Sequence, residues 1–545
     1  MRHIGQFVTL PRPTGDIILI VFSCALVLVL FGPLLQAGWS VYADHELQVY
    51  LGPSGHVPLA KVPSLLLQTE VGYPDQVNRY RPTTYLMWIL EASFWGNHPG
   101  SWQAARIAML MISLSSLTVA FGRLFIWPLA ASLSSLLMSA PYWSTVWIGI
   151  GPNEQYMALF LSAFCWSYAS LHGWPPAITV HNRSKVVAWL VCSVSAILLV
   201  GIKENMMIIL VPLVWLAFIS WRADRSVDYR MVLMLAVFGW STFIFQAVVV
   251  GTMRQGVDFY GNPISLSYRL KNLIATFWHS PLIFMAGVLI VLVMVLQCIS
   301  RSTSNERAAA IARSLWLAVL LQGALFGLAL SHAFFYDGWP YDSRYAFPGH
   351  LLVFVSVAQL LYLALSIAGE FRPSWTPVLE IGVTIAVLAV AVHSGFAGLR
   401  ASVETFVEAS QSYTRQIENI VSIAASNPSV PLIIESATPY DLEPVFSVNR
   451  FVRMRGIRSP MFLRLHNLEK ASFPQQPFFY GLIDTLAQIS RTGTLPSFGS
   501  TGTLPSPFLV EFSPLNELPP GGPCFSIVLA MAPASGCEVI AHITY

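Results

Sequence analysis

Long apolar runs separated by short polar connections constrain this chain more than any other feature. Of its 545 residues, 55% are hydrophobic and only 10% are charged, whereas charged residues make up about a quarter of an ordinary soluble protein. A helix needs about 20 mostly apolar residues to cross the hydrocarbon core of a bilayer. The pattern therefore predicts a polytopic α-helical membrane protein, and it excludes a soluble enzyme, a coiled coil and a disulfide-rich scaffold.

About eleven of these runs are long enough to span a membrane. The first, Ile17–Ala37, follows Arg2 and Arg12 and is longer than the apolar core of a signal peptide, so we expect an uncleaved span. The other predicted spans are 103–121, 124–141, 155–172, 186–202, 204–220, 231–251, 279–299, 314–332, 349–368 and 378–398.

The distribution of Lys and Arg predicts the orientation, because short cytoplasmic loops carry an excess of both. With a cytoplasmic N-terminus, every inside connection contains Arg or Lys, whereas the long first outside loop, 38–102, and the other outside loops hold most of the acidic residues. An odd number of spans leaves the C-terminal region outside. Compact loops favour a multi-pass protein of the bacterial inner membrane.

The segment 82–96 is apolar but short, and it contains Glu91 together with Tyr85, Trp88 and Trp95. We expect a helix that lies in the plane of the membrane surface, where such aromatic residues are favourable. A short true span is the alternative, and it would invert the orientation of every later loop.

The composition changes after residue 398, which predicts a membrane module over 1–398 and a soluble extracytoplasmic domain over 399–545. Alternating and helical patterns indicate a mixed α/β domain. The sequence leaves open whether Cys524 and Cys537 are bridged, which would require an oxidising compartment. Strands are predicted at 431–437, 507–513 and 524–532, and helices near 401–424 and 480–490.

Ionisable residues gather at the predicted outside ends of the spans, and such positions are candidates for function. The alternative is that these residues lie in solvated loops and have no function, and that Lys203 and Glu204 only neutralise each other. A dense run of arginines in the C-terminal domain, 450–464, either faces an anionic partner or is a solvated surface. The residues at the span ends are Asp44, Glu46, Arg81, Glu154, Lys203, Glu204, Arg344 and Tyr345.

The order of these features resembles the GT-C glycosyltransferases that use polyprenyl-phosphate sugars, especially bacterial relatives of protein O-mannosyltransferases and of the lipid A aminoarabinose transferase. The resemblance covers most of residues 15–400. It rests on the acidic pair at 44 and 46, the Tyr-Arg-Pro at 80–82, Glu154, the Lys-Glu at 203–204, and Arg344, Tyr345 and Pro348.

The resemblance implies that a sugar is transferred from a polyprenyl-phosphate donor to an extracytoplasmic acceptor with inversion. Asp44 would be the general base, with Glu46 supporting it and both available to a divalent metal in relatives that bind one. The cations Arg81, Lys203 and Arg344 would bind the donor phosphate, and Glu154, Glu204 and Tyr345 would support the site. No other cofactor is implied, and the partners are the lipid-linked donor, the acceptor and membrane lipid.

Two other classes compete with this interpretation. A secondary transporter of lipid or sugar would also be polytopic, but internal repeats and polar residues near the midplane are typical of transporters, and the polar residues here lie at one surface. Another membrane transferase, such as a polysaccharide ligase, is the second alternative. A net charge of +3 gives no reason to expect a nucleic-acid partner.

Overall fold

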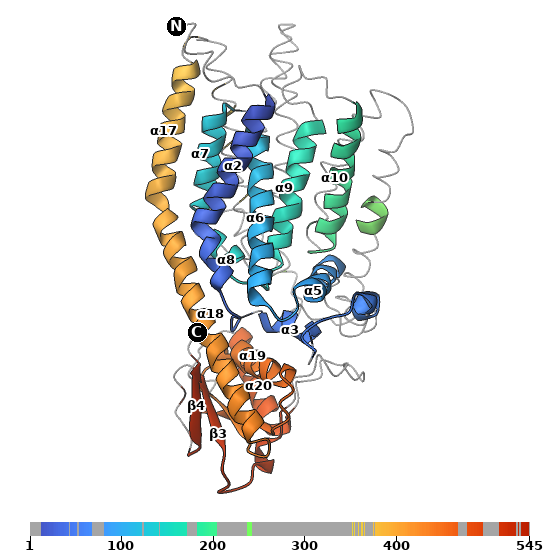
Figure 1. Cartoon of the computed structure of the whole chain (residues 1–545), viewed down its shortest axis with the longest axis vertical. Helices are drawn as coiled ribbons and strands as arrows, with labels where there is room; N and C mark the ends of the chain where they lie inside the picture. Colours follow the sequence, from blue (N-terminus) through green and yellow to red (C-terminus); the bar gives the residue numbers. More distant parts are fainter. Residues whose placement is uncertain are drawn as a thin grey trace.

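The computed structural model has a layer of long helices and a smaller α/β unit at one end of that layer (Figure 1). The predicted spans 204–220, 231–251, 279–299, 314–332 and 349–368 lie largely outside the residues that the structure describes. These residues are 12–42, 44–51, 54–67, 81–122, 125–140, 142–171, 182–203, 206, 237–241, 267, 351, 354, 358, 361–362, 365, 374, 376–466, 477–493, 512–529, 532 and 536–543.

The long helices correspond to the apolar runs of the described sequence. Three segments in that part of the chain, Thr14–Gln36, Pro99–Gly122 and Pro377–Ser426, are long and apolar enough to cross a membrane. The chain is therefore a membrane protein. The helices of the layer are α2 (Arg12–Phe31, followed by the 3-10 turn η1, Gly32–Gln36), α6 (Pro99–Gly122), α7 (Trp127–Met138), α9 (Glu154–Leu171), α10 (Asn182–Val200) and α17 (Thr376–Ser394).

Small polar side chains join the helices inside the layer. Thr118 of α6 accepts a hydrogen bond from Ser23 of α2 at 2.9 Å and contacts Ser134 of α7 at 2.7 Å. Each of these hydroxyls also lies within hydrogen-bonding distance of a carbonyl of its own helix, which competes for its single proton. Interhelical hydrogen bonds and close backbone approach stabilise helix packing in lipid, where burial of apolar area does not.

Short elements lie at the end of the layer that faces the α/β unit (Figure 1). Helix α5 meets the end of α10 there, through the hydrogen bond from Thr83 N–H to the carbonyl of Gly201, 3.0 Å. With 14 residues α5 is about 21 Å long, which is shorter than the hydrocarbon core of about 30 Å that a span crosses; its expected position in the plane of the membrane surface stays a prediction. The elements are α3 (Asp44–Leu51), η2 (Leu59–Lys61), α4 (Val62–Leu66), α5 (Pro82–Trp95) and α8 (Tyr142–Trp147).

The buried face of α5 includes Trp88 and Glu91. The helix therefore uses this face to pack against the protein, because Glu91 pairs with α6.

The α/β unit contains a parallel four-stranded sheet in the order β2-β1-β3-β4. The predicted strands 431–437 and 524–532 correspond to β1 and β3, and the predicted helices to α18 and α20. The predicted strand 507–513 is described only at 512 and 513, which are not in a strand. The elements are α18 (Phe396–Ser426), β1 (Leu432–Ser436), η6 (Pro439–Asp441), α19 (Leu442–Met454), β2 (Met461–Leu465), α20 (Pro477–Thr492), η9 (Leu515–Glu517), β3 (Phe525–Leu529) and β4 (Glu538–Ile543).

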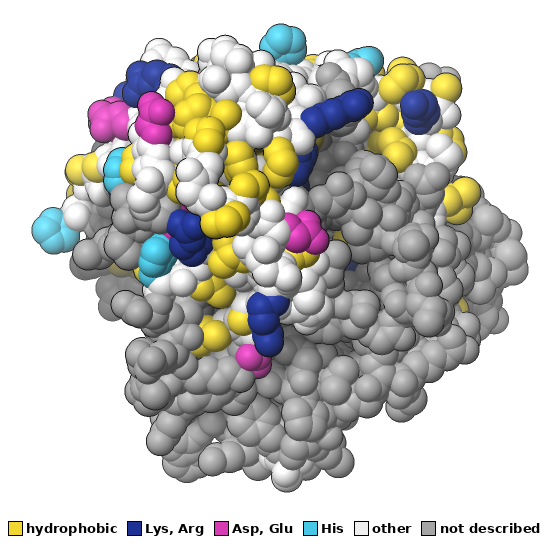
Figure 2. Space-filling view, turned by 90° about the horizontal axis from the view of Figure 1, so that it is seen from below, with side chains coloured by type: hydrophobic (Ala, Val, Ile, Leu, Met, Phe, Trp, Pro, Cys, Tyr) yellow, Lys and Arg dark blue, Asp and Glu magenta, His cyan; other side chains and the backbone are white. Residues whose placement is uncertain are grey.

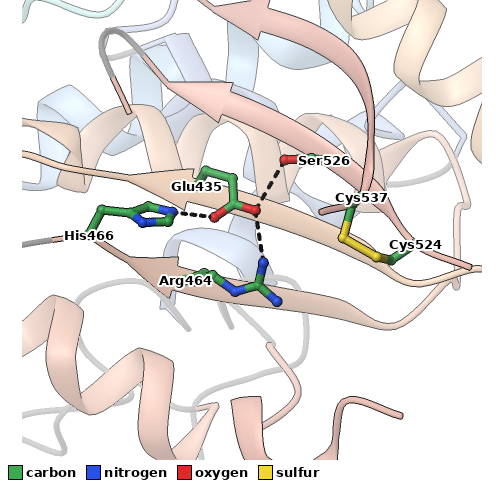
Figure 3. The surroundings of a disulfide bond; sticks show 6 residues. All are labelled: Glu435, Arg464, His466, Cys524, Ser526 and Cys537. Atoms are coloured by element: carbon green, nitrogen blue, oxygen red, sulfur yellow. Dashed lines mark hydrogen bonds and ion pairs between the residues drawn. A yellow bond between two sulfur atoms is a disulfide. The ribbon is translucent and has the colours of Figure 1, made fainter. Parts of the chain in front are cut away.

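A buried carboxylate links three strands of this sheet (Figure 3). Glu435 of β1 is fully buried, and its oxygens contact His466 Nε2 at 2.7 Å and Arg464 Nη1 at 3.3 Å. The hydroxyl of Ser526 on β3 donates to the same carboxylate at 3.1 Å. The register pairs Glu435 with Arg464, so both side chains stand on one face of the sheet. A buried carboxylate requires such partners.

Cys524 and Cys537 form a disulfide, which settles the alternative left open by the sequence. They directly precede β3 and β4, which pair in parallel. The bridge therefore joins the starts of two neighbouring strands (Figure 3).

Replacing both cysteines, Cys524→Ser with Cys537→Ser, should lower the stability of the α/β unit. The bridge closes a loop with a sequence separation of 13, and a loop of that size stabilises by about 3 kcal/mol. Limited proteolysis of the purified protein should cut the mutant faster within 399–545. Cys24→Ser, which changes a free cysteine of α2, is the control. Equal cutting of the double mutant and the control would contradict the prediction.

Candidate functional site

Asp44, the first residue of α3, lies at the end of the helical layer and is fully buried. Its Oδ2 accepts a hydrogen bond from the backbone N–H of Ser40 at 2.8 Å. Its Oδ1 accepts one from the N–H of Ile150 at 3.3 Å. One carboxylate therefore joins the segment before α3 to the loop between α8 and α9.

The surroundings of Asp44 raise the pKa of its carboxyl from 3.8 to about 7. Burial is the largest cause, because it disfavours the charged form. The N–H groups of Ser40 and Ile150 and the charge of Arg106 act in the opposite direction and limit the rise. Near neutral pH the carboxyl therefore exists in both protonation states, which suits a group that takes up and releases a proton.

Arg106 of α6 forms the centre of a buried network beside Asp44. Its Nε donates to the carbonyl of Ile150 at 3.2 Å. The N–H of the same residue donates to Asp44, so Ile150 is hydrogen-bonded to both side chains. The two terminal nitrogens of Arg106 reach both oxygens of Glu91 on α5, at 2.5 and 2.7 Å. The hydroxyl of Tyr156 on α9 donates to Glu91 at 2.5 Å and accepts from Arg106 at 2.9 Å. The network ties α5, α6 and α9 together.

The sequence interpretation missed this network. Arg106 lies within the predicted span 103–121, Glu91 in the segment expected at the membrane surface, and Tyr156 in the predicted span 155–172, and the sequence interpretation pairs none of them. The available signal was the presence of one cation and one anion in neighbouring apolar segments, since charges at such positions usually pair.

Lys203 and Glu154 form a second buried ion pair at the same end of the layer. Lys203 Nζ lies 2.7 Å from Glu154 Oε1, and their side chains are 4% and 3% exposed. The suggestion that Lys203 is neutralised by Glu204 is therefore incomplete, because Lys203 pairs with the first residue of α9. A carboxylate at a helix N-terminus is also favourable for the helix dipole.

Arg81 directly precedes α5 and is buried. The hydrogen bond from Thr83 to Gly201 brings the start of α5 against the turn that carries Lys203. A β-carbon at Gly201 would collide with Thr83, so this close approach requires glycine. Arg81 and Lys203, two of the three cations predicted to bind the donor phosphate, thus lie on neighbouring backbone segments.

The structure brings Asp44, Arg81, Glu154 and Lys203 to one end of the helical layer. Glu46 belongs to α3, but its side chain is outside the described residues, as are Glu204, Arg344 and Tyr345. Their predicted roles stay predictions.

Within the described residues, no group of three or more His, Cys, Asp and Glu side chains is arranged to hold a metal ion. The two oxygens of Asp44 already accept backbone N–H groups. Glu46, the other residue predicted to be available to a divalent metal, has its side chain outside the described residues, so a metal at this site stays a prediction.

The arginine run at 450–464 does not form one exposed cationic surface. Arg453 donates to the carbonyls of Ile457 and Ser459 at 3.1 and 2.9 Å, and Arg455 pairs with Glu418 at 2.7 Å. Arg464 contacts Glu435. Figure 2 shows basic, acidic, histidine and apolar side chains interspersed over the described part of this end of the molecule.

Comparison with known proteins finds a structural likeness. No family model matches the chain, and neither does any curated protein. The chain is similar to the crystal structure of the Archaeoglobus fulgidus oligosaccharyltransferase tethered with an acceptor peptide, at 10% identity and a TM-score of 0.41. The match covers 82% of this chain and 63% of that one, so the chain spans less than two thirds of that transferase. At this identity and score, the likeness assigns neither a fold nor an activity.

Replacing Arg106 by Met should destabilise the protein strongly, because it leaves Glu91 as a buried charge that has lost its cation. Breaking a buried pair in this way costs about 3–5 kcal/mol. Adding Glu91→Leu removes the remaining charge and should recover much of the loss. Thermal unfolding in detergent measures both. A double mutant no more stable than Arg106→Met would contradict the assignment of the pair.

Proposed function

We propose that the chain is a membrane glycosyltransferase that moves a sugar from a polyprenyl-phosphate donor to an extracytoplasmic acceptor, with inversion of the anomeric carbon. The observation that supports this most is the placement of Asp44. A buried carboxyl with a pKa of about 7 lies at the same end of the helical layer as the buried cations Arg81 and Lys203. The order of these residues in the sequence, which resembles that of the GT-C enzymes, supports this class of reaction.

The chemistry needs a base and cations in separate roles. Asp44 takes the proton of the acceptor hydroxyl as the acceptor oxygen forms its bond to the anomeric carbon. The bond between that carbon and the phosphate oxygen breaks, and the electron pair leaves with the polyprenyl phosphate. Arg81 and Lys203 stabilise the negative charge that grows on the phosphate, and a low dielectric strengthens this effect. Attack opposite the leaving group gives inversion.

Access to Asp44 requires movement. The carboxylate is fully buried, and α3 packs against α5 on one side and α19 of the α/β unit on another. The acceptor hydroxyl therefore reaches Asp44 after a displacement in its surroundings. A shift of α19 relative to α3 would couple binding of the acceptor to movement at the boundary of the two units.

Transfer of radiolabelled sugar from a panel of polyprenyl-phosphate sugars, by the purified protein in detergent, tests this function. Asp44→Asn should lower transfer by about 10²–10⁴-fold, the usual effect of losing a general base, while the folded protein still binds the donor. Asp484→Asn, which changes an exposed aspartate of α20, is the control and should stay active. A wild type that transfers no sugar, but moves lipid or sugar across proteoliposomes, would favour the transporter.

The pH dependence of transfer gives an independent test. The base is active when deprotonated, so the rate should fall about tenfold per pH unit below the pKa of Asp44 and level off above it. With a pKa of about 7, the change of slope is expected near neutral pH. A rate that stays constant down to pH 5 or so would show that no group with a raised pKa acts as the base.

A further inference from the structure

Residues 38–42, which we call the linker, connect η1 to α3 and are held by α18 of the α/β unit. The N–H of Gly38 donates to Ser410 Oγ at 3.1 Å, and the N–H of Trp39 donates to Thr414 Oγ1 at 2.8 Å. Ser410 and Thr414 are one helical turn apart, so both hydroxyls stand on the same face of α18. Two successive backbone N–H groups of the linker thus bind one helix from a distant part of the sequence.

The contact between the linker and α18 leaves no space for a larger residue. A β-carbon at Gly38 would collide with the side chain of Thr414 and the carbonyl of Ser410. The neighbouring Trp39 is buried, and its ring packs against Phe451 of α19 with centroids 5.9 Å apart and against Trp102 of α6 at 6.4 Å. The linker is therefore fixed between the helical layer and the α/β unit.

The linker in turn holds Asp44. The residue after Trp39 is Ser40, whose N–H donates to Asp44 Oδ2 at 2.8 Å. The hydroxyl of Ser40 donates to the carbonyl of Tyr42 at 2.8 Å, which closes the turn before α3. A displacement of Trp39 would move the donor that orients this carboxylate.

We propose that Ser410 and Thr414 are positioning residues for Asp44: by binding the backbone of the linker, they keep the carboxylate oriented and shielded from water. The α/β unit is then a part of the active site. This inference rests on the proposed role of Asp44 as the base. Loss of the Thr414 hydroxyl leaves the N–H of Trp39 without its acceptor in a buried place, which favours opening of the linker.

Several charged and titratable groups near the linker could also affect the titration of Asp44. The charge of Arg106 on α6 acts on Asp44, and Asp44 lies within electrostatic range of Tyr413 on α18. Glu91 of α5 is engaged by Arg106, and the acids Asp441 and Glu443 act on Tyr42. Thr414 carries no charge, so its replacement changes Asp44 through position and hydration alone.

The first measurement is hydrogen exchange of the full-length protein in detergent, followed in peptides that cover the linker. Thr414→Val removes the hydroxyl with little change of shape and should speed exchange there by about 3- to 10-fold, as expected for one lost hydrogen bond. Thr414→Ser keeps the hydroxyl and should restore protection. Ser402→Val is the matched control, since Ser402 is an exposed residue of α18 whose hydroxyl donates to the carbonyl of Gly398 in the same helix.

The second measurement is an infrared titration of the protonated carboxyl band, identified as the band that Asp44→Asn removes. Opening of the linker has two opposite effects on the pKa of Asp44: entering water lowers it, and displacement of the Ser40 N–H raises it. Because burial is the largest cause of the raised pKa, the pKa in Thr414→Val should fall by about half a unit or more, and Thr414→Ser should titrate like the wild type. An unchanged titration in Thr414→Val, even with faster exchange, would overturn the positioning role. This readout needs no sugar transfer, so failure of the wild type to transfer sugar would overturn the proposed function separately.

Discussion

Two charges buried at the end of an apolar helical layer have to be neutralised, and Arg106 and Glu91 do this through two parallel hydrogen bonds. The planar guanidinium fits a carboxylate in this geometry, which fixes the orientation of both side chains. Because the same guanidinium holds the carbonyl of Ile150, it also fixes the loop whose N–H binds Asp44. The position of the candidate base therefore depends on an ion pair that the proposed chemistry does not use directly.

A second constraint comes from the continuity of the chain between the two units. α17 and α18 form almost one rod, interrupted at Gly395, where a β-carbon would collide with the carbonyl of Ser139. The rod leaves the helical layer beside α7 and enters the α/β unit, where α18 meets the linker (Figure 1). Movement of the α/β unit would be transmitted to the segment before Asp44. The contact between α18 and the linker therefore keeps the carboxylate of Asp44 buried, and a movement of α18 would expose it.

The sequence predicted those parts of the molecule that depend on local pattern. Apolar runs identified α2, α6, α9, α10 and α17, since a membrane requires a minimum helix length. Lys203, Glu154 and Asp44 were found because ionisable residues at the ends of apolar runs are conspicuous. The bond of Gly38 to Ser410 joins residues 372 positions apart, and the Glu91–Tyr156 contact spans 65. Such partners are set by helix packing, for which a single sequence carries little signal.

The central claim is that the buried polar residues at this end of the layer bind a lipid-linked sugar. Photo-crosslinking with a polyprenyl-phosphate analogue that carries the reactive group near its phosphate, followed by mass spectrometry of the labelled peptides, tests it most directly. The account predicts labelling in the segments that contain Asp44, Arg81 and Lys203, suppressed by excess unlabelled donor. Labelling confined to the exposed apolar side chains of α2 and α17, or labelling that the donor does not suppress, would contradict it.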